Sequence, residues 1–341
     1  MTRTALTAAE LAGTGKGILA ADESVRTMSA RLQAAGVPAT EENRRAYREM
    51  LITTPDLTLG ISGVILCDET FRQRLTDGRT FPEALHDQAI LPGIKVDTGA
   101  KPLPGSPGET ITEGLDGLRD RLTEYMALGA RFAKWRAVIR IGTGDGRPSW
   151  QALSANAHAL ARYASLCQEA GLVPIVEPEV LMNGAHGIER CREATQAALL
   201  LTFGELNDYR VDMDGIVLKP NMVLPGENSA EVAPPDTVAS HTMRALRCVV
   251  PEEVAGVAFL SGGQGPARAT ANLAAMPRHG APWPLTFSFG RALVDPALAA
   301  WHGDPALADA GRQALANRIA CNVAALQGSY TAALETSYAL A

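Results

Sequence analysis

Short apolar runs recur along the 341-residue chain; most end in a polar residue, and a helical stretch follows. Glycine or proline borders most of the runs, and β-branched residues are frequent within them, which favours strands over short buried helices. The eight predicted strands are Gly17–Asp22, Ile61–Leu66, Leu91–Val96, Arg131–Arg136, Leu172–Glu177, Gly215–Lys219, Val257–Ser261 and Leu285–Ser288.

The polar ends of the third to seventh predicted strands are evenly spaced. From Lys95 through Lys134, Glu177 and Lys219 to Ser261, the intervals are 39 to 43 residues. A strand with its crossover helix needs about 30 residues or more, so each interval holds one strand–helix unit with its loops. Eight such units in one α/β chain favour a closed (β/α)8 barrel, or TIM barrel, over an open doubly wound sheet.

Helix signals fill the intervals between the predicted strands. Thr40 precedes two acidic residues and predicts a capped helix through Leu51. Alanine-rich Ser154–Ala170 stops at a glycine, as helices often do. The Pro- and Gly-rich stretch 97–113 is expected to be a long loop. Further helical segments are expected within 230–250, interrupted near Pro234, and within 304–326.

The chain shows no internal linker that would divide it into two domains. We expect one TIM-barrel domain over residues 1–320 and a short C-terminal helical segment with a mobile tail over residues 321–341.

Composition excludes several classes of protein. The net charge of −6 argues against a nucleic acid or an anionic membrane as partner. Five scattered cysteines without a Cys-x-x-Cys pair indicate reduced thiols and a cytoplasmic location. The N-terminus lacks a signal-peptide pattern, and no apolar run approaches the roughly 18 residues of a membrane span. Six dispersed histidines make a catalytic metal site unexpected.

Lysine is rare in this chain: only five of its 31 basic residues are lysines. Three of the five, Lys95, Lys134 and Lys219, lie at the ends of predicted strands, where catalytic groups of such barrels are found. Arginine cannot replace lysine where a nucleophilic amine or a compact charge is needed. The alternative interpretation is structural ion pairing with Asp22, Glu177 and Glu179.

Lys219 follows an apolar strand, so burial would lower its pKa, and a neighbouring cation such as Lys134 would lower it further. The free amine could form a Schiff base with a ketone, and the iminium would withdraw electrons from the adjacent carbon–carbon bond. Such chemistry needs neither a metal nor an organic cofactor.

Glu177 and Glu179 are two residues apart and would lie on one side of an extended chain. Such a pair of carboxylates suits general acid–base catalysis. The alternative interpretation is that the two carboxylates only balance the charge of nearby cations.

Two loops after the last predicted strands are candidates for phosphate binding, a common role of these loops in such barrels. Glycines in 261–265 and 288–293 would let backbone N–H groups approach an anion, and Arg291 could add a bidentate contact. Ordinary turns are the alternative. Lys95, together with Thr27, Arg31 and Arg136, predicts a second phosphate site and hence an anionic substrate with a phosphate at each end.

Eight motifs, in order along most of the chain, together resemble the class I, Schiff-base-forming fructose-1,6-bisphosphate aldolases. The motifs are Lys16-Gly-Ile-Leu-Ala-Ala-Asp-Glu-Ser24, Thr40-Glu-Glu-Asn-Arg-Arg45, Gly93-Ile-Lys-Val-Asp97, Phe132-Ala-Lys-Trp-Arg136, Pro174-Ile-Val-Glu-Pro-Glu179, Leu218-Lys-Pro-Asn-Met222, Phe259-Leu-Ser-Gly-Gly-Gln264 and Phe287-Ser-Phe-Gly-Arg-Ala-Leu293.

The resemblance implies a cytoplasmic lyase of glycolysis and gluconeogenesis, typically a homotetramer. It would reversibly cleave fructose 1,6-bisphosphate into dihydroxyacetone phosphate and glyceraldehyde 3-phosphate without a metal or cofactor. Lys219 would form the Schiff base, and Glu177 would act as general acid and base. Glu179 and Lys134 would support them, with Lys134 holding the carboxylates. Asp22 would take the proton of the hydroxyl on the fourth carbon.

The resemblance also divides the expected substrate-binding residues between two phosphates. The ketose-side phosphate would contact Ser261, Gly262, Gly290 and Arg291, and the other phosphate would contact Ser24, Thr27, Arg31, Lys95 and Arg136.

Some positions depart from the pattern of the family. Thr27 stands where serine is common, and Phe289 where tyrosine is often seen. Many relatives end in a tyrosine that folds over the active site, whereas Tyr338 here is followed by three more residues. Two alternatives therefore stay open: an aldolase preferring another ketose phosphate such as fructose 1-phosphate, and a non-catalytic barrel that binds a partner.

Overall fold

The computed structural model describes residues 2–13, 15–142, 144 and 146–337. Its main sheet consists of eight parallel strands that neighbour one another in chain order, so every predicted strand is confirmed. The strands are β1 (Gly17–Ala21), β2 (Ile61–Leu66), β3 (Leu91–Lys95), β6 (Phe132–Ile139), β7 (Val173–Val180), β8 (Val217–Leu218), β9 (Gly256–Phe259) and β10 (Leu285–Phe287).

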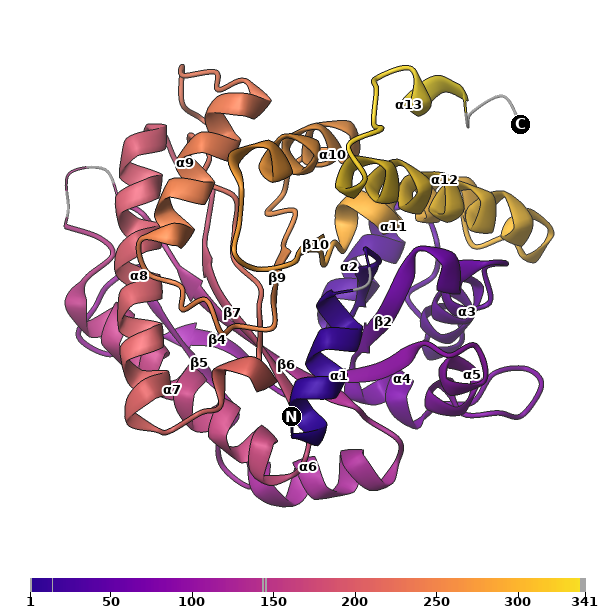
Figure 1. The fold of residues 1–341 in the computed structure, drawn as a ribbon. Coiled ribbons are helices and arrows are strands. Elements are labelled where there is room, and N and C mark those ends of the chain that lie inside the picture. The colour runs from indigo at the N-terminus through magenta and orange to yellow at the C-terminus, as the bar shows by residue number, and fades with distance from the viewer. Residues whose placement is uncertain (1, 14, 143, 145, 338–341) are drawn as a thin grey trace.

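The sheet curls until its two edge strands meet. The N–H of Ala20 in β1 donates to the carbonyl oxygen of Phe289, just after β10, at 3.0 Å. The hydroxyl of Thr286 donates to the carbonyl oxygen of Lys16 at 2.6 Å. These bonds join the ends of the sheet into a (β/α)8 barrel, around whose outside the connecting helices are arranged (Figure 1). The predicted closure over an open sheet is therefore confirmed.

Helices follow the strands, as the sequence predicts. Thr40 caps α3 through a bond from the N–H of Asn43, and α9 begins at Pro235, where proline costs no hydrogen bond. Within the described ranges, no helix is both long and apolar enough to cross a bilayer. The helices are α1 (Arg3–Ala12), α2 (Val25–Ala34), α3 (Glu41–Ile52), α4 (Asp68–Arg72), α5 (Phe81–Asp87), α6 (Leu118–Ala127), α7 (Trp150–Glu169), α8 (Ile188–Asp208), α9 (Pro235–Arg247), α10 (Pro266–Ala275), α11 (Arg291–Trp301), α12 (Ala308–Leu326) and α13 (Leu334–Ser337).

The expected long loop over 97–113 is wrong in part, because it contains a hairpin. Strands β4 (Gly99–Pro102) and β5 (Thr110–Glu113) pair antiparallel. The hydroxyls of Thr110 and Thr112 donate to carbonyl oxygens of β6 at 3.1 and 2.8 Å, which fixes the hairpin against the barrel. The alternating Thr-Ile-Thr-Glu pattern is the strand signal that the surrounding prolines and glycines obscure.

The interior of the barrel is filled from its amino-terminal end. Helix α1 packs Ala8, Leu11 and Ala12 against side chains of the strands, so this end is plugged. Glycines make room for large rings inside: a Cβ atom on Gly93 would lie 2.2 Å from the Phe132 ring, which is fully buried. Only the carboxyl-terminal end of the barrel therefore remains for a site.

The C-terminal segment does not divide from the barrel at the expected boundary. Helix α12 runs through residue 320 to Leu326, and Cys321 within it is buried. Arg318 of α12 forms an ion pair with Glu335 of α13, and the Tyr330 hydroxyl donates to Glu335 at 2.9 Å. The mobility of the tail stays a prediction, and Tyr338 lies outside the described residues.

The close packing at Gly93 yields a stability prediction. Gly93→Ala should lower the free energy of unfolding by about 1–3 kcal/mol, because the added methyl group overlaps a buried ring. Gly204→Ala, four residues before the end of α8, is the matched control: nothing lies within 4 Å of its Cβ position. It should stabilise the protein by about 1 kcal/mol. Urea unfolding followed by circular dichroism measures both, and equal stability of the Gly93 variant and the wild type would contradict the packing.

Candidate active site

One cavity of about 950 Å³ opens at the carboxyl-terminal end of the barrel strands. Parallel strands all present this end to the same face, so residues far apart in sequence meet there. Every one of the fourteen site residues expected from the sequence lines it: Asp22, Ser24, Thr27, Arg31, Lys95, Lys134, Arg136, Glu177, Glu179, Lys219, Ser261, Gly262, Gly290 and Arg291.

Four charged side chains form the centre of this cavity, of which Lys134, Glu177 and Lys219 are buried and Asp22 is partly buried. The Nζ atom of Lys134 lies 2.8 Å from Oε2 of Glu177 and 3.0 Å from Oδ2 of Asp22. The Nζ atom of Lys219 lies 3.3 Å from Oε1 of Glu177. Two ammonium groups thus balance two carboxylates, which is the condition under which such charges can be held away from water. We call these four residues the central ion network.

The network sets the protonation states of its carboxylates. Burial alone raises the pKa of Asp22, but the ammonium groups of Lys134, Lys219 and Lys95 outweigh it and hold the pKa well below its usual range. Burial likewise opposes ionisation of Glu177, and Lys134 and Lys219 again reverse the effect and lower its pKa. Both carboxylates are therefore ionised at neutral pH in the resting protein.

Lys134 differs from the sequence-based expectation of a cation that mainly repels Lys219. Burial lowers the pKa of Lys134, but its carboxylate partners Asp22 and Glu177 raise it well above the usual range. Lys134 forms ion pairs with both carboxylates, and these contacts are attractive. Lys134 is consequently a permanent cation, and its geometry fits the holding of the carboxylates that the resemblance implies.

Lys219 is held in place by its neighbours along the chain. Strand β8 ends one residue earlier, and the N–H of Lys219 donates to the carbonyl oxygen of Val176 at 2.8 Å. Two residues later, the side chain of Asn221 accepts from the N–H of Val180 and donates to the hydroxyl of Thr195, both at 3.1 Å. The amine is thus fixed beside β7, the strand that carries Glu177.

The two glutamates of β7 have different partners. Glu177 contacts both lysines of the central ion network, whereas Glu179 forms an ion pair with Arg136 of β6. In the parallel pair, Arg136 is aligned with Glu177 and Val138 with Glu179, so the Arg136 side chain reaches Glu179 diagonally, two residues along β7. Alternate residues of both strands therefore face the cavity together.

The two glycine-containing loops also border the cavity. Gly262 and Gly263 adopt φ values of 59° and 88°, a conformation that favours glycine. The side chain of Gln264 donates to the carbonyl oxygen of Ser261 at 2.9 Å and so fixes this loop. Ser288, which the sequence analysis did not select, lines the cavity with a buried hydroxyl that lacks a hydrogen-bond partner among the described residues. Its position directly after β10 was the available signal.

The expected cations of the second phosphate site are engaged with carboxylates. Arg31 pairs with Glu23 and, at 2.6 Å, with Asp295. Lys95 lies 2.6 Å from Oδ1 of Asp97 and donates to its carbonyl oxygen at 2.8 Å.

The two hydroxyls of this group belong to the start of α2. The Ser24 hydroxyl accepts from the N–H of Thr27 at 3.2 Å and thereby caps the helix. It also lies 3.0 Å from the Thr27 hydroxyl.

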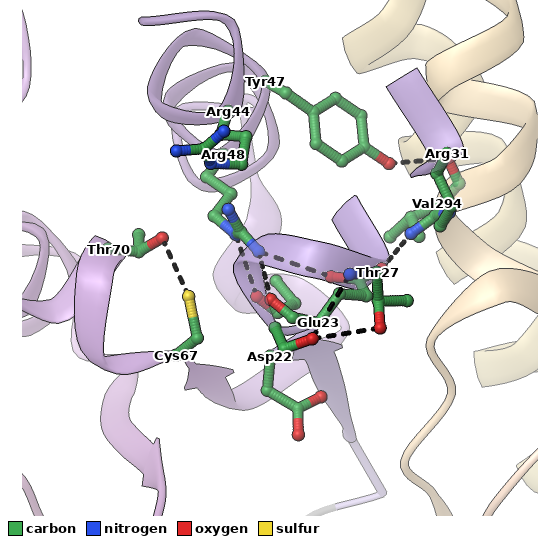
Figure 2. Close-up of polar contacts among 12 residues, drawn as sticks. Asp22, Glu23, Thr27, Arg31, Arg44, Tyr47, Arg48, Cys67, Thr70 and Val294 are labelled. Atoms are coloured by element: carbon green, nitrogen blue, oxygen red, sulfur yellow. Dashed lines mark hydrogen bonds and ion pairs between the residues drawn. The ribbon is translucent and has the colours of Figure 1, made fainter. Parts of the chain in front are cut away.

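Arg48 is a residue that sequence analysis missed. It is fully buried, and Figure 2 shows it reaching from α3 to the chain at Asp22 and Glu23. Its guanidinium donates to the carbonyl oxygens of Ala21 and Glu23 at 3.2 and 2.7 Å. These carbonyls flank Asp22, so Arg48 fixes the backbone that carries this carboxylate. An arginine in a helix carries no signal in the sequence for such a distant contact.

Asp97 is a second missed residue, and it joins three segments at the rim. Besides pairing with Lys95, its carboxylate accepts from the N–H of Gly99 at 3.1 Å and of Arg136 at 3.3 Å.

A metal site usually needs at least three ligating side chains close together. In the described part of the chain, histidine, cysteine, aspartate and glutamate side chains form no such group.

Comparisons with known proteins agree with this geometry. The family model described as fructose-bisphosphate aldolase class-I matches residues 4–340. The probable fructose-bisphosphate aldolase class 1 of Xanthomonas campestris is 54% identical over 87% of this chain and 89% of that protein. Cytosolic fructose-bisphosphate aldolase 6 of Arabidopsis thaliana is 49% identical over 95% of this chain and 90% of that protein.

A solved structure extends the likeness to the fold. The fructose-bisphosphate aldolase of Plasmodium falciparum, crystallised with TRAP and a small-molecule inhibitor, superposes with a TM-score of 0.95. The two chains are 44% identical in sequence, and the match covers 96% of this chain and 95% of the Plasmodium chain. The chain therefore belongs to the class-I fructose-bisphosphate aldolases, lyases that reversibly cleave fructose 1,6-bisphosphate into dihydroxyacetone phosphate and glyceraldehyde 3-phosphate through a lysine Schiff base.

Proposed function

We propose that Lys219 is the lysine that forms the Schiff base and that the central ion network supplies the proton transfers. The observation that carries this proposal is the contact of the Lys219 amine with Glu177, which also contacts Lys134 inside the same cavity. Lys134 is held as a cation by two carboxylates, so Lys219 is the better candidate for the nucleophile.

Imine formation requires that Lys219 lose a proton and that a hydroxyl later leave as water. Glu177 is ionised and lies 3.3 Å from the amine, so it is placed to accept the proton from the ammonium. The neutral amine then attacks the ketone carbon of the substrate. Protonated Glu177 returns a proton to the hydroxyl of the carbinolamine, which departs as water and leaves the iminium.

Carbon–carbon cleavage requires a base at the other side of the reacting centre. Asp22 is ionised and borders the cavity, so we assign it the proton of the hydroxyl on the fourth carbon. As this proton leaves, the bond between the third and fourth carbons breaks and its electron pair moves into the iminium. The aldehyde is released, and the remaining enamine takes up a proton and is hydrolysed to regenerate Lys219.

Lys134 and Glu179 support these steps without bonding to carbon. Lys134 keeps Asp22 and Glu177 ionised and fixes their separation. Glu179 balances the charge of Arg136 at the edge of the central ion network.

We assign the two phosphates to opposite parts of the cavity. The loops after β9 and β10 supply backbone N–H groups and one arginine for the ketose-side phosphate. The region of α2, β3 and β6 is assigned to the other phosphate. The first group is Ser261, Gly262, Gly290 and Arg291, and the second is Ser24, Thr27, Arg31, Lys95 and Arg136.

Two alternative functions are less well supported. A non-catalytic barrel would have no need of a buried amine beside a buried carboxylate, an arrangement that costs free energy. A preference for fructose 1-phosphate would leave the cations of the second group without a ligand. By likeness to its relatives, which include a cytosolic aldolase, we also propose a cytoplasmic homotetramer serving glycolysis and gluconeogenesis.

Covalent trapping tests the assignment of Lys219. Borohydride reduction in the presence of dihydroxyacetone phosphate should add the triose to Lys219, located by peptide mass analysis, because reduction makes the imine permanent. Lys219→Arg should give no adduct and no measurable cleavage, since a guanidinium does not form the imine. Lys16→Arg, at a position outside the cavity, is the control and should retain both. An adduct on any other lysine would refute the assignment.

Arg48 allows the role of Asp22 to be tested separately. Arg48→Lys should shift the backbone that carries Asp22 and reduce kcat for fructose 1,6-bisphosphate by roughly 10-fold to 100-fold. Trapping of dihydroxyacetone phosphate on Lys219 should remain within about twofold of the wild type, because imine formation does not use Asp22. Arg45→Lys, which alters a neighbouring arginine paired at the surface, is the control. Equal losses of cleavage and trapping would contradict this assignment.

A further inference from the structure

The charges that line the cavity do not balance. Its lining residues include eight lysines and arginines but only five aspartates and glutamates, in a protein whose net charge is −6. The central ion network is neutral in itself, so the excess lies elsewhere on the wall. The location of the unbalanced cations identifies where an anionic substrate gains most from binding.

Three of the expected phosphate-binding cations contribute little of this excess. Arg31, Lys95 and Arg136 each form an ion pair with a carboxylate. Three other cations that line the cavity form no ion pair within the described residues, namely Arg26, Lys101 and Arg291. A phosphate that binds a paired cation must compete with the carboxylate already there, whereas an unpaired cation is immediately available.

Arg291 belongs to the loops assigned to the ketose-side phosphate, which leaves Arg26 and Lys101 for the opposite end. Arg26 lies in the first turn of α2, between the Ser24 and Thr27 positions of the second phosphate group. Lys101 lies in β4, and the hairpin that carries it is fixed to β6 by the Thr110 and Thr112 hydroxyls. Both side chains are exposed at the mouth of the cavity.

We propose that Arg26 and Lys101 are specificity-determining residues that bind the phosphate of the substrate farther from Lys219 and so select bisphosphate over monophosphate ketoses. This inference rests on the proposed function for the identity of the substrate. Lys95 and Arg31 remain contacts of the same phosphate, and the unpaired Arg26 and Lys101 add positive charge that no carboxylate offsets. Neither Arg26 nor Lys101 touches the reacting carbons, so both act on binding and not on the chemical step.

The test compares kcat and KM for fructose 1,6-bisphosphate and fructose 1-phosphate in Arg26→Gln, Lys101→Gln and the double variant. Each single substitution should raise KM for the bisphosphate roughly tenfold at low salt, because one charge-assisted contact is lost. The kcat for the bisphosphate should stay within about twofold of the wild-type value. The kcat and KM for the monophosphate should also stay within about twofold of their wild-type values. Arg26→Lys should recover part of the loss, since it restores the charge but not the planar donor fork.

The control is Arg278→Gln, which removes the same charge from an exposed position that does not line the cavity. It should leave the ratio of the two KM values unchanged and thereby exclude an effect of net charge alone. Equal losses with both substrates, or an unchanged KM for the bisphosphate in the double variant, would overturn the proposal.

A binding measurement separates this proposal from the proposed function. Calorimetry with hexane-1,6-diol bisphosphate, which has no carbonyl and cannot form an imine, should show weaker binding to the double variant than to the wild type. Hexan-1-ol phosphate should show no such difference. Failure of Lys219 trapping would refute the proposed function, whereas unaltered binding of the diol bisphosphate to the double variant would refute only the roles of Arg26 and Lys101.

Discussion

The pairing of the Lys134 ammonium with the carboxylates of Asp22 and Glu177 is the interaction on which the rest of the site depends. Asp22 and Glu177 come from different strands, and burial opposes the charge of each. Lys134 lies between them, 3.0 and 2.8 Å away, holds them close together and lowers the pKa of each more than any other cation does. The amine of Lys219 then meets an ionised acceptor at 3.3 Å instead of a protonated acid. The proton transfers that we assign to this site depend on that state.

The barrel makes this arrangement possible because it plugs one end and leaves the other open. Apolar residues of α1 and the rings of Phe132 and Phe287 fill the amino-terminal end and the interior. Charged residues can therefore be concentrated at the carboxyl-terminal end, where the backbone is fixed by partners such as Arg48 and Asn221. The cavity consequently has hydrogen-bonded and ion-paired groups at its centre and an excess of cations on its wall, as a doubly phosphorylated substrate requires.

Much of this could be predicted from the sequence because strand ends are regularly spaced. The interval of about 40 residues places Lys134, Glu177 and Lys219 on one face, whatever the details of the loops. The ion pairs around the cavity could not be predicted from the sequence. Asp295, for example, lies 264 residues from its partner Arg31, and no local pattern connects them. The same holds for Arg48. The β4–β5 hairpin was missed because the prolines and glycines around it obscure its short alternating pattern, and because its contacts with β6 cannot be seen in the sequence.

The pH dependence of cleavage in a Lys134→Met variant tests the central claim most directly. Removing the ammonium takes away the charge that most strongly opposes the effect of burial on Asp22 and Glu177, so their pKa values should rise and the acid limb of kcat/KM should move to higher pH. We predict this shift together with a loss of at least roughly 100-fold in kcat at neutral pH. An acid limb superimposable on that of the wild type, in a variant that remains folded by circular dichroism, would contradict the account.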